Sequence, residues 1–487
     1  MKFKKSITLL LVLSMLLSSM AACGSIETAE TIAETAAAET VPEETETTRV
    51  STDLPDSDFE GYAFHIIYEK INRYPEVDVE ELNGETINDA VYQRNAAVED
   101  LYNVTIEGIM DASAANAVKA SVNAGDNAYD ITMATALTTA NMATGALLLD
   151  INEIPYIDLS KPWYDQYAND AISIGGRQHM IVGELNIRDN DSTYLLMFNQ
   201  KLATELGIDN LYDMALEGTW TMDRMTEILQ LCAVDLNGDG VQNEHDQWGL
   251  LGEAWNTNVY IAGAGEHVFL KDENDIPYIA MGTERYFDVF NRAYNINGNK
   301  EYSWIVNDYP SYGNDVWTVR NNIFKEDRSL FFTGIVGSMG DFREMITDFG
   351  IMPIPKYDEE QEFYHSILTL GQATAIAVPK SMEDGDRTGI LVEALSAEGL
   401  YILTPAYYDI CVTTKFARDE IFTQILDMVF SARVFELGLL YNWGGLFYVP
   451  SDLTAAHKTD LASRVESVSK SAMNALEKTL TALEIEH

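Results

Sequence analysis

Cysteine is scarce in this chain of 487 residues, which contains only Cys23, Cys232 and Cys411. Three cysteines exclude a disulfide framework, although one bridge between Cys232 and Cys411 stays open. Both of these residues lie in apolar surroundings. Free cysteine behaves as a small buried hydrophobe, so we expect two buried free thiols.

Basic residues are also few, with 31 Lys and Arg against 77 Asp and Glu and a formal net charge of -46. Such acidity disfavours nucleic acids and anionic membrane surfaces as partners. It does not identify a ligand, because a secreted protein gains solubility from the same charge.

Long apolar runs are missing beyond the N-terminus. There, three lysines precede the apolar run Ile7–Leu17, the pattern of a signal peptide over residues 1–22. This run is too short for a transmembrane helix. The segment Ser19–Cys23 resembles a lipoprotein processing site, with Met20 in place of the usual leucine. We therefore predict a lipid anchor on Cys23 at the extracellular face of the cytoplasmic membrane, and no other membrane contact.

Residues 24–57 repeat Glu, Thr and Ala and have hardly any bulky apolar residue. Such a segment cannot bury enough surface to order itself, so residues 23–57 are predicted to form a disordered tether. As a coil it would hold the folded part roughly 30–35 Å from the anchor on average.

Catalytic motifs are missing too. The sequence has no H-E-x-x-H, no G-x-S-x-G, no P-loop and no cysteine-rich zinc pattern. Glycoside hydrolysis needs two carboxylates at a set separation in space, and the sequence does not show whether any of its 77 acidic residues form such a pair. A carbohydrate-active enzyme therefore stays open as an alternative.

The folded part begins near Phe59 with an alternation of strands and helices. Alternating elements predict a parallel sheet with helices on its faces. The expected strands and helices are Tyr62–Tyr68, Ile87–Tyr102, Val104–Ile106, Ala112–Ala124 and Tyr129–Met133, in the order strand, helix, strand, helix, strand.

A second informative stretch covers residues 329–364. The spacing predicts a strand at Leu330–Phe332, a glycine-rich loop, a helix capped by Asp341 and running to Phe349, and a strand at Ile351–Pro355. A loop of this kind before a helix offers free backbone N–H groups to a bound molecule. The alternative is a plain strand-turn-helix-strand unit.

Several blocks resemble bacterial extracellular solute-binding proteins (family 1, carbohydrate-type) of ABC transporters. They are "NDAVYQRNAAVEDLYNV", "DSTYLLMFNQKLATELGI", "FFTGIVGSM", "FGIMPIPKYDEEQ" and "LGQATAIAVPKS", in this order along the chain. The resemblance implies an α/β, two-lobed periplasmic-binding-protein-like fold (type II), each lobe a mixed sheet flanked by helices, with a hinge between. It places residues 58–198 and 349–386 in the first lobe and 199–348 and 387–487 in the second, crossing at Tyr194–Asn199 and Asp348–Pro353.

The same resemblance implies a monomeric lipoprotein, not an enzyme. It would capture a carbohydrate, expected to be an oligosaccharide, by hinge closure and deliver it to separate ABC permease subunits. Peptides or another small solute are alternative ligands. A sensor role and a surface-anchored glycoside hydrolase are alternative functions.

The sharpest local motif follows the calcium-loop pattern D-x-[DN]-x-[DN]-G, with a carboxylate after five further residues. Its ligands would be oxygens of Asp235, Asn237, Asp239, Val241 and Asp246, with Gly240 at the sharp turn. Asp246 is one methylene shorter than the usual glutamate. The prediction is a structural calcium ion, and the alternative is a turn without metal.

Aromatic residues are plentiful, with 7 Trp, 25 Tyr and 18 Phe. An aromatic ring beside polar groups matches the apolar face and hydroxyl rim of a sugar. Because polar or glycine neighbours flank them, we predict that Trp255, Trp304, Tyr408 and Trp443 bind the ligand. For any one of them, core packing is the alternative.

Polar ligand contacts are predicted at three places. Asp189 and Asn190 precede the first crossing strand, and Asp341 and Arg343 begin the expected helix. Gln372 lies in an apolar segment, where a buried amide needs a partner. The alternative for each is a solvated surface position.

Overall fold

The computed structural model describes residues 49–70, 74–413 and 420–485. Ser51–His487 forms one compact unit, and every element described below belongs to it. The predicted signal peptide, Cys23 and the tether up to residue 48 lie outside the described residues.

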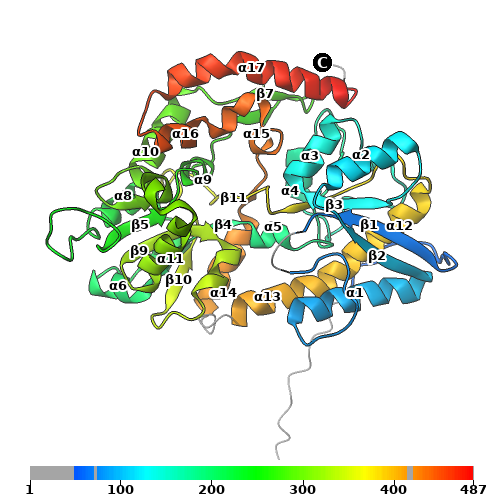
Figure 1. Cartoon of the computed structure of the whole chain (residues 1–487), viewed down its shortest axis with the longest axis horizontal. Coiled ribbons are helices and arrows are strands. Elements are labelled where there is room, and N and C mark those ends of the chain that lie inside the picture. The colour runs from blue at the N-terminus through cyan, green and yellow to red at the C-terminus, as the bar shows by residue number, and fades with distance from the viewer. Residues whose placement is uncertain (1–48, 71–73, 414–419, 486–487) are drawn as a thin grey trace, which may run out of the picture. The chain divides into compact units, whose positions relative to one another are not determined.

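The first lobe is built on a four-stranded sheet in the order β12-β3-β1-β2. β1 pairs in parallel with β2 and β3, as predicted, and β12 is antiparallel to β3. Helices cover this sheet (Figure 1). The elements are β1 (Tyr62–Tyr68), α1 (Thr86–Tyr102), β2 (Val104–Met110), α2 (Ala114–Ala124), β3 (Ile131–Thr135), α3 (Ala136–Thr144), α4 (Gln166–Ile172), β12 (Thr374–Ala377) and α12 (Gly385–Glu398).

The second lobe is built on a five-stranded mixed sheet in the order β10-β4-β9-β5-β8. β9, β5 and β8 are parallel, whereas β4 and β10 make antiparallel pairs. Its elements are β4 (Tyr194–Asn199), α6 (Gln200–Glu205), α7 (Leu211–Leu216), α8 (Met222–Leu229), β5 (Trp248–Gly252), α9 (Asn256–Gly263), β6 (Phe269–Lys271), β7 (Pro277–Ile279), α10 (Glu284–Asn297), β8 (Ser303–Ile305), α11 (Val316–Lys325), β9 (Ser329–Ile335) and β10 (Phe349–Met352).

Short elements join the two lobes. The helix α5 (Arg188–Asp191) leads into β4, and the backbone N–H of Thr369 donates to the carbonyl of Ser192 at 3.0 Å. Beside them, β11 (Ser366–Ile367) pairs in parallel with β13 (Arg433–Val434). The chain then ends in α13 (Thr404–Thr413), α14 (Glu420–Ser431), α15 (Leu437–Leu440), α16 (Val449–Ala455) and α17 (Leu461–Ala482), of which α13 and α14 precede β13. We call residues 188–194, 366–369 and 433–434 the hinge segments.

Local sequence explains much of this architecture. All seven residues of β9 are buried, which suits a strand in the middle of a sheet covered on both faces. In α1, Ile87, Val91 and Val98 lie on the buried face, as the helical spacing predicts, whereas Leu101, predicted on the same face, is 66% exposed. The side chain of Thr221 accepts the N–H of Arg224 at 3.3 Å, so it caps α8.

The predicted lobe boundaries need correction. β4 and β10, assigned to the first lobe, pair within the second sheet because their apolar residues complete its core. Conversely, α12 was expected in the second lobe. Its buried residues Ile390, Leu391 and Leu395 share a hydrophobic cluster with β1 residues of the first sheet. Length and composition would also let the helical stretch Gly385–Cys411 cross a membrane. However, 61% of its apolar window is buried, as in a core helix.

The expected helix from Asp341 to Phe349 is wrong. A short 3-10 helix, η4 (Val336–Phe342), replaces it, and residues 343–348 are irregular. Phe342, Met345 and Phe349 are buried, but the side chain of Ile346 is 97% exposed, so the helical spacing did not reflect one packed face. The expectation of two buried thiols outside any disulfide is confirmed for Cys232 and Cys411, and burial raises the pKa of each thiol to about 12.

Candidate functional site

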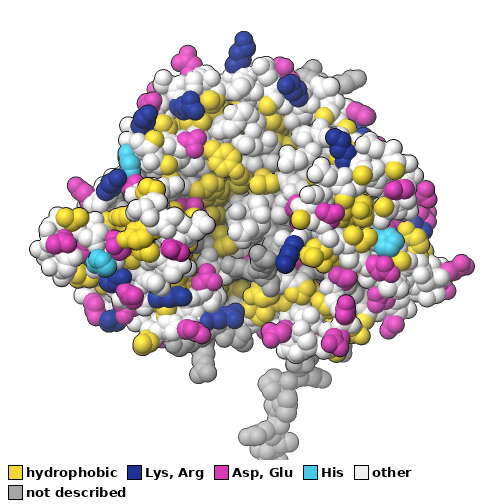
Figure 2. Space-filling model, viewed as in Figure 1, with side chains coloured by type: hydrophobic (Ala, Val, Ile, Leu, Met, Phe, Trp, Pro, Cys, Tyr) yellow, Lys and Arg dark blue, Asp and Glu magenta, His cyan; other side chains and the backbone are white. Residues whose placement is uncertain are grey.

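Both sheets turn the carboxyl ends of their parallel strands toward the hinge segments. Ile335, at the end of β9, pairs with Tyr194, which is the first residue of β4 and the last residue of the hinge segment 188–194. In α/β folds, ligands bind at such carboxyl edges where connections diverge. Figure 2 shows this face hollowed at its centre, where hydrophobic side chains gather between the two lobes.

The first lobe contributes a cavity of about 370 Å³ at the ends of β1 and β2. Tyr68, Glu69, Tyr74, Met110 and Arg188 are among its lining residues. Tyr68 and Met110 are the last residues of β1 and β2, and Glu69 and Tyr74 belong to the loop after β1. The Tyr74 ring meets Tyr407 of α13 edge to face, with 6.4 Å between ring centroids. The cavity therefore combines an aromatic ring with polar groups.

A buried ion pair fixes the wall of this cavity. Nε of Arg188 lies 3.1 Å from Oε2 of Glu76, and both side chains are almost fully buried. Glu76 also accepts the backbone N–H groups of Ile187 and Arg188, at 2.9 and 3.0 Å. Arg188 in turn donates to the carbonyl of Tyr74 at 2.6 Å. The loop bearing Tyr74 is thus tied directly to the hinge segment 188–194.

Arg94 of α1 supports the same loop from beneath. Its guanidinium donates to the carbonyls of Glu76 at 2.7 Å, Val77 at 3.1 Å and Leu185 at 2.8 Å. Full burial lowers the pKa of Arg94 to about 10, although Glu76 and Asp78 act in the opposite direction. The cation satisfies backbone carbonyls that would otherwise be buried without a donor.

The second lobe contributes aromatic rings and two charges. Trp255, just after β5, stacks on Tyr194 with 5.1 Å between centroids and remains partly exposed. The guanidinium of Arg320 lies over the rings of Trp317 and Phe332, at 4.9 and 4.4 Å. Trp317 is 41% exposed. This edge of the second sheet offers flat apolar surfaces beside a cation.

Glu253 and Arg320 influence each other's protonation. Burial raises the pKa of Glu253, and Arg320 partly offsets this. Burial likewise lowers the pKa of Arg320, which Glu253, Tyr194 and Asp341 counteract. The charges of the two groups balance. Arg320 can donate hydrogen bonds to a neutral polar ligand, and Glu253 can accept hydrogen bonds from it.

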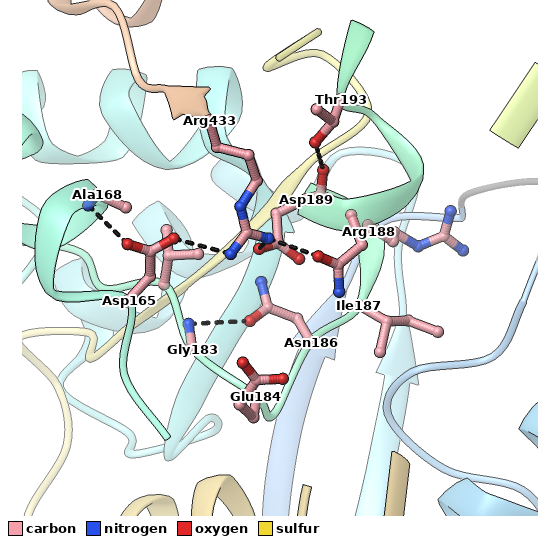
Figure 3. Close-up of polar contacts among 12 residues, drawn as sticks. Asp165, Ala168, Gly183, Glu184, Asn186, Ile187, Arg188, Asp189, Thr193 and Arg433 are labelled. Carbon is pink, nitrogen blue, oxygen red and sulfur yellow. Dashed lines mark hydrogen bonds and ion pairs between the residues drawn. The ribbon is translucent and has the colours of Figure 1, made fainter. Parts of the chain in front are cut away.

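A second polar cluster surrounds Arg433 of β13 (Figure 3). Its guanidinium lies 2.6 Å from Asp189, 3.0 Å from Asp165 and 2.5 Å from the Asn190 amide oxygen. Burial raises the pKa of Asp189 from 3.8 to about 7; Arg433 opposes this shift and Glu184 adds to it. Burial alone would lower the pKa of Arg433, but the carboxylates raise it. The cluster joins a first-lobe loop, α5 and β13.

Solved structures with this architecture bind sugars in several cases. The sugar-binding protein MalE of the phytopathogen Xanthomonas citri superposes with a TM-score of 0.59 at 14% identity, covering 87% of this chain and 100% of that one. UspC of M. tuberculosis gives 0.55 at 15% identity, with coverages of 85% and 100%. The galacto-N-biose-/lacto-N-biose I-binding protein of the ABC transporter from Bifidobacterium longum gives 0.55 at 12% identity, with coverages of 87% and 99%.

The chain has the periplasmic-binding-protein fold. This confirms the fold that the sequence resemblance implied. No protein-family model matches the sequence, and no curated protein matches it either.

The predicted aromatic residues have different fates in this fold. Trp255 lies at the carboxyl edge of the second sheet, next to the hinge. Trp304 and Trp443 are 0% and 2% exposed, stacked on Tyr309 and Tyr441. Both are core residues that offer no surface to a ligand, so their predicted role is wrong. Tyr408 packs edge to face against Phe430, between α13 and α14.

The predicted polar residues are also scattered. Asp189 and Asn190 are buried and hold Arg433. Asp341 and Arg343 are exposed at the end of η4. Gln372 is exposed in the turn before β12, so the expected buried amide is wrong. Only Asp341 joins the edge that carries Trp255, through its effect on the Arg320 pKa.

The predicted calcium loop folds through its own hydrogen bonds. Asp235 accepts the N–H groups of Gly238 and Gly240 at 2.6 and 2.8 Å, and Asn237 accepts that of Asp239. The buried carboxylate of Asp246 accepts the N–H groups of Leu236 and Asn243. Within the described part of the chain, no three Asp, Glu, His or Cys side chains gather closely enough to hold a metal. Calcium binding stays a prediction.

Sequence reasoning missed Tyr74, Glu253, Trp317, Arg320 and Arg433. Glu253 follows a buried strand at its carboxyl end, and Tyr74 lies in the loop after β1; this placement signal could have singled them out. Arg433 had no local signal, because its partners lie far away in sequence. Arg320 lies three residues after Trp317, but its acidic neighbour Glu253 is distant in sequence.

Proposed function

We propose that this protein captures a neutral carbohydrate, expected to be an oligosaccharide, outside the cytoplasmic membrane for import by an ABC permease. One observation carries the proposal. Two sheets bring their carboxyl ends to one hinge. The loop after β1 carries Tyr74, and the second-lobe edge carries Trp255 with the balanced charges of Glu253 and Arg320, next to Trp317 of α11.

The chemistry of these groups suits a sugar. The partly exposed rings of Tyr74 and Trp255 match the apolar C–H face of a pyranose. Glu253 accepts hydrogen bonds from hydroxyls, and Arg320 donates to them. A charged ligand would leave one of the two groups opposed by a like charge. Support also comes from the neighbouring structures, since MalE is a sugar-binding protein and the Bifidobacterium longum protein binds lacto-N-biose.

Binding is proposed to act through hinge closure. A ligand that touches both lobes favours the closed arrangement by the difference between its affinities for the two states. The hinge segments absorb the rotation, and the permease recognises the closed form. We further propose a monomer that Cys23 anchors to the membrane by lipid, with separate permease subunits as its partners.

A panel of neutral oligosaccharides tests the ligand class. We expect one or more glycans to raise the melting temperature without forming product, and scattering to show a smaller radius at saturation. Amino acids and short peptides serve as the matched negative panel. New reducing ends would favour a glycoside hydrolase instead. Stabilisation by peptides alone would reject the carbohydrate, and an unchanged radius at saturation would count against hinge closure.

A further inference from the structure

The lobes also touch at a place away from the hinge segments. There, the hairpin β6–β7 of the second lobe meets the first-lobe turn at residues 173–176. The Asp275 carboxylate accepts the hydroxyl of Ser173 and the N–H of Gly176, both at 2.9 Å. Its backbone carbonyl accepts the N–H of Gly175 at 2.9 Å. One residue of the hairpin therefore receives three hydrogen bonds from the opposite lobe.

Lys271, on the other side of the same hairpin turn, reinforces the contact. Its ammonium donates to the Ser173 hydroxyl at 2.9 Å and to the carbonyl of Asp170, and it pairs with the carboxylate of Asp275. The side chains of Lys271 and Asp275 are 17% and 24% exposed, so solvent weakens this pair less than at an open surface. Lys271 and Asp275 of the hairpin therefore both hydrogen-bond to the same first-lobe turn, residues 173–176.

The C-terminal end of the chain touches the same turn. Figure 1 shows α17 reaching across from α16 toward α3, and α17 contacts elements of both lobes. Gly175 has φ +60°, and a Cβ there would lie 2.6 Å from Cγ2 of Ile485. Nη2 of Arg177 also donates to the carbonyl of Glu484 at 3.4 Å. The turn is thus held from two directions.

Rotation about the hinge segments has a consequence for these contacts. Residues 173–176 and 271–275 belong to different lobes, so a change of lobe angle displaces one set against the other. Hydrogen bonds lose most of their strength when distance and angle leave a narrow range. The contacts therefore favour the lobe angle seen here, and each is modest enough to be exchanged for water.

We propose that hairpin β6–β7 and residues 484–485 after α17 form a clasp that holds the lobe angle and has to release before the lobes rotate. This device goes beyond the proposed ligand and does not depend on it.

Distance measurement between the lobes, without any ligand, tests the clasp. Spin labels are placed at Gln93→Cys on α1 and Glu205→Cys on α6, both exposed, in protein carrying Cys23→Ser. The native Cys232 and Cys411 are buried and should not react. The test variants are Asp275→Ala and Lys271→Met. The matched control is Glu273→Ala, which removes the same charge as Asp275→Ala from an exposed position of the same hairpin.

We expect a narrow distance distribution in the unmodified clasp and in Glu273→Ala, and a broadened or shifted one in Asp275→Ala and Lys271→Met. Amide exchange at Gly175 and Gly176 should quicken about tenfold in Asp275→Ala, since a typical hydrogen bond is lost. If Asp275→Ala does not fold, the distance distribution in Lys271→Met tests the clasp instead. Unchanged distributions in the folded variants would overturn the proposal, and so would faster exchange without any change in lobe distance.

Discussion

Nη1 of Arg433 lies 2.6 Å from Oδ2 of Asp189, which joins β13 to the helix that leads into the second lobe. The same guanidinium reaches Asp165 of the first lobe at 3.0 Å. A planar guanidinium has enough donors to serve several oxygens at once. Three carboxylates, those of Asp165, Glu184 and Asp189, influence this one cation. The excess of negative charge makes the hinge sensitive to protonation.

Replacing Asp189 with asparagine should remove part of this pH dependence. The pKa of Asp189 is 3.8 ordinarily and about 7 in the folded protein, so its protonated form stabilises the fold. That stability is complete below pH 3.8 and is lost as the pH rises through 7. Urea unfolding at pH 5 and pH 8 should show the wild type losing stability relative to Asp189→Asn, by about 1.4 kcal/mol for each pKa unit involved.

Glu393 provides an internal check on this experiment. Its pKa is also raised to about 7, mainly by burial, but it is present in both proteins and its contribution cancels. In Asp189→Asn, the new side-chain amide keeps an oxygen that accepts from Arg433. An equal difference in unfolding free energy at both pH values would contradict the argument.

Glu76 and Arg188 give a second prediction, because they form a buried pair. Glu76→Ala should destabilise the protein by about 3–5 kcal/mol, since it leaves the Arg188 charge buried without its partner. The double variant Glu76→Ala/Arg188→Met should recover part of the loss. Denaturant unfolding of the two single variants and the double variant measures the coupling. Strictly additive effects would show that the pair does not act as a unit.

Sequence reasoning succeeded where local pattern decides structure. β1 was predicted at the bounds that the structure shows, because alternating apolar residues distinguish strands. The bounds of β4 are those that the family resemblance implied for the first crossing segment. The fold implied by the resemblance then places the carboxyl ends of the parallel strands near the hinge.

Local pattern failed where packing across the chain decides the outcome. Trp304 has polar neighbours in sequence, yet it stacks on Tyr309 inside the second lobe. The polar neighbours of a tryptophan describe the strand or loop around it, not the direction of its ring. Likewise, Arg433 gains its partners from residues more than two hundred positions earlier. No spacing rule within one segment could have found that cluster.

Trp255 should contribute to ligand affinity. Trp255→Ala removes a partly exposed ring that rests on Tyr194, and truncating an aromatic anchor should weaken binding at least about tenfold. Calorimetry with a glycan found in the stabilisation panel measures this change. Tyr92→Ala removes an exposed ring from α1, outside both carboxyl edges, and should leave affinity unchanged. Equal affinity in Trp255→Ala and the wild type would remove Trp255 from the site.

The loop Asp235–Asp246 gives the last prediction. We expect calcium to raise the melting temperature and EDTA to lower it, because the sequence motif offers the oxygen ligands that calcium prefers. The loop already turns at Gly238 and Gly240, with φ of 73° and 79°, but its carboxylates are engaged by backbone N–H groups. Binding an ion would therefore rearrange the loop and should be weak. Asp239→Asn, which keeps the acceptor for the Val241 N–H, should reduce the calcium shift without lowering the melting temperature in EDTA. An identical melting temperature with calcium and with EDTA would leave the loop a turn without metal.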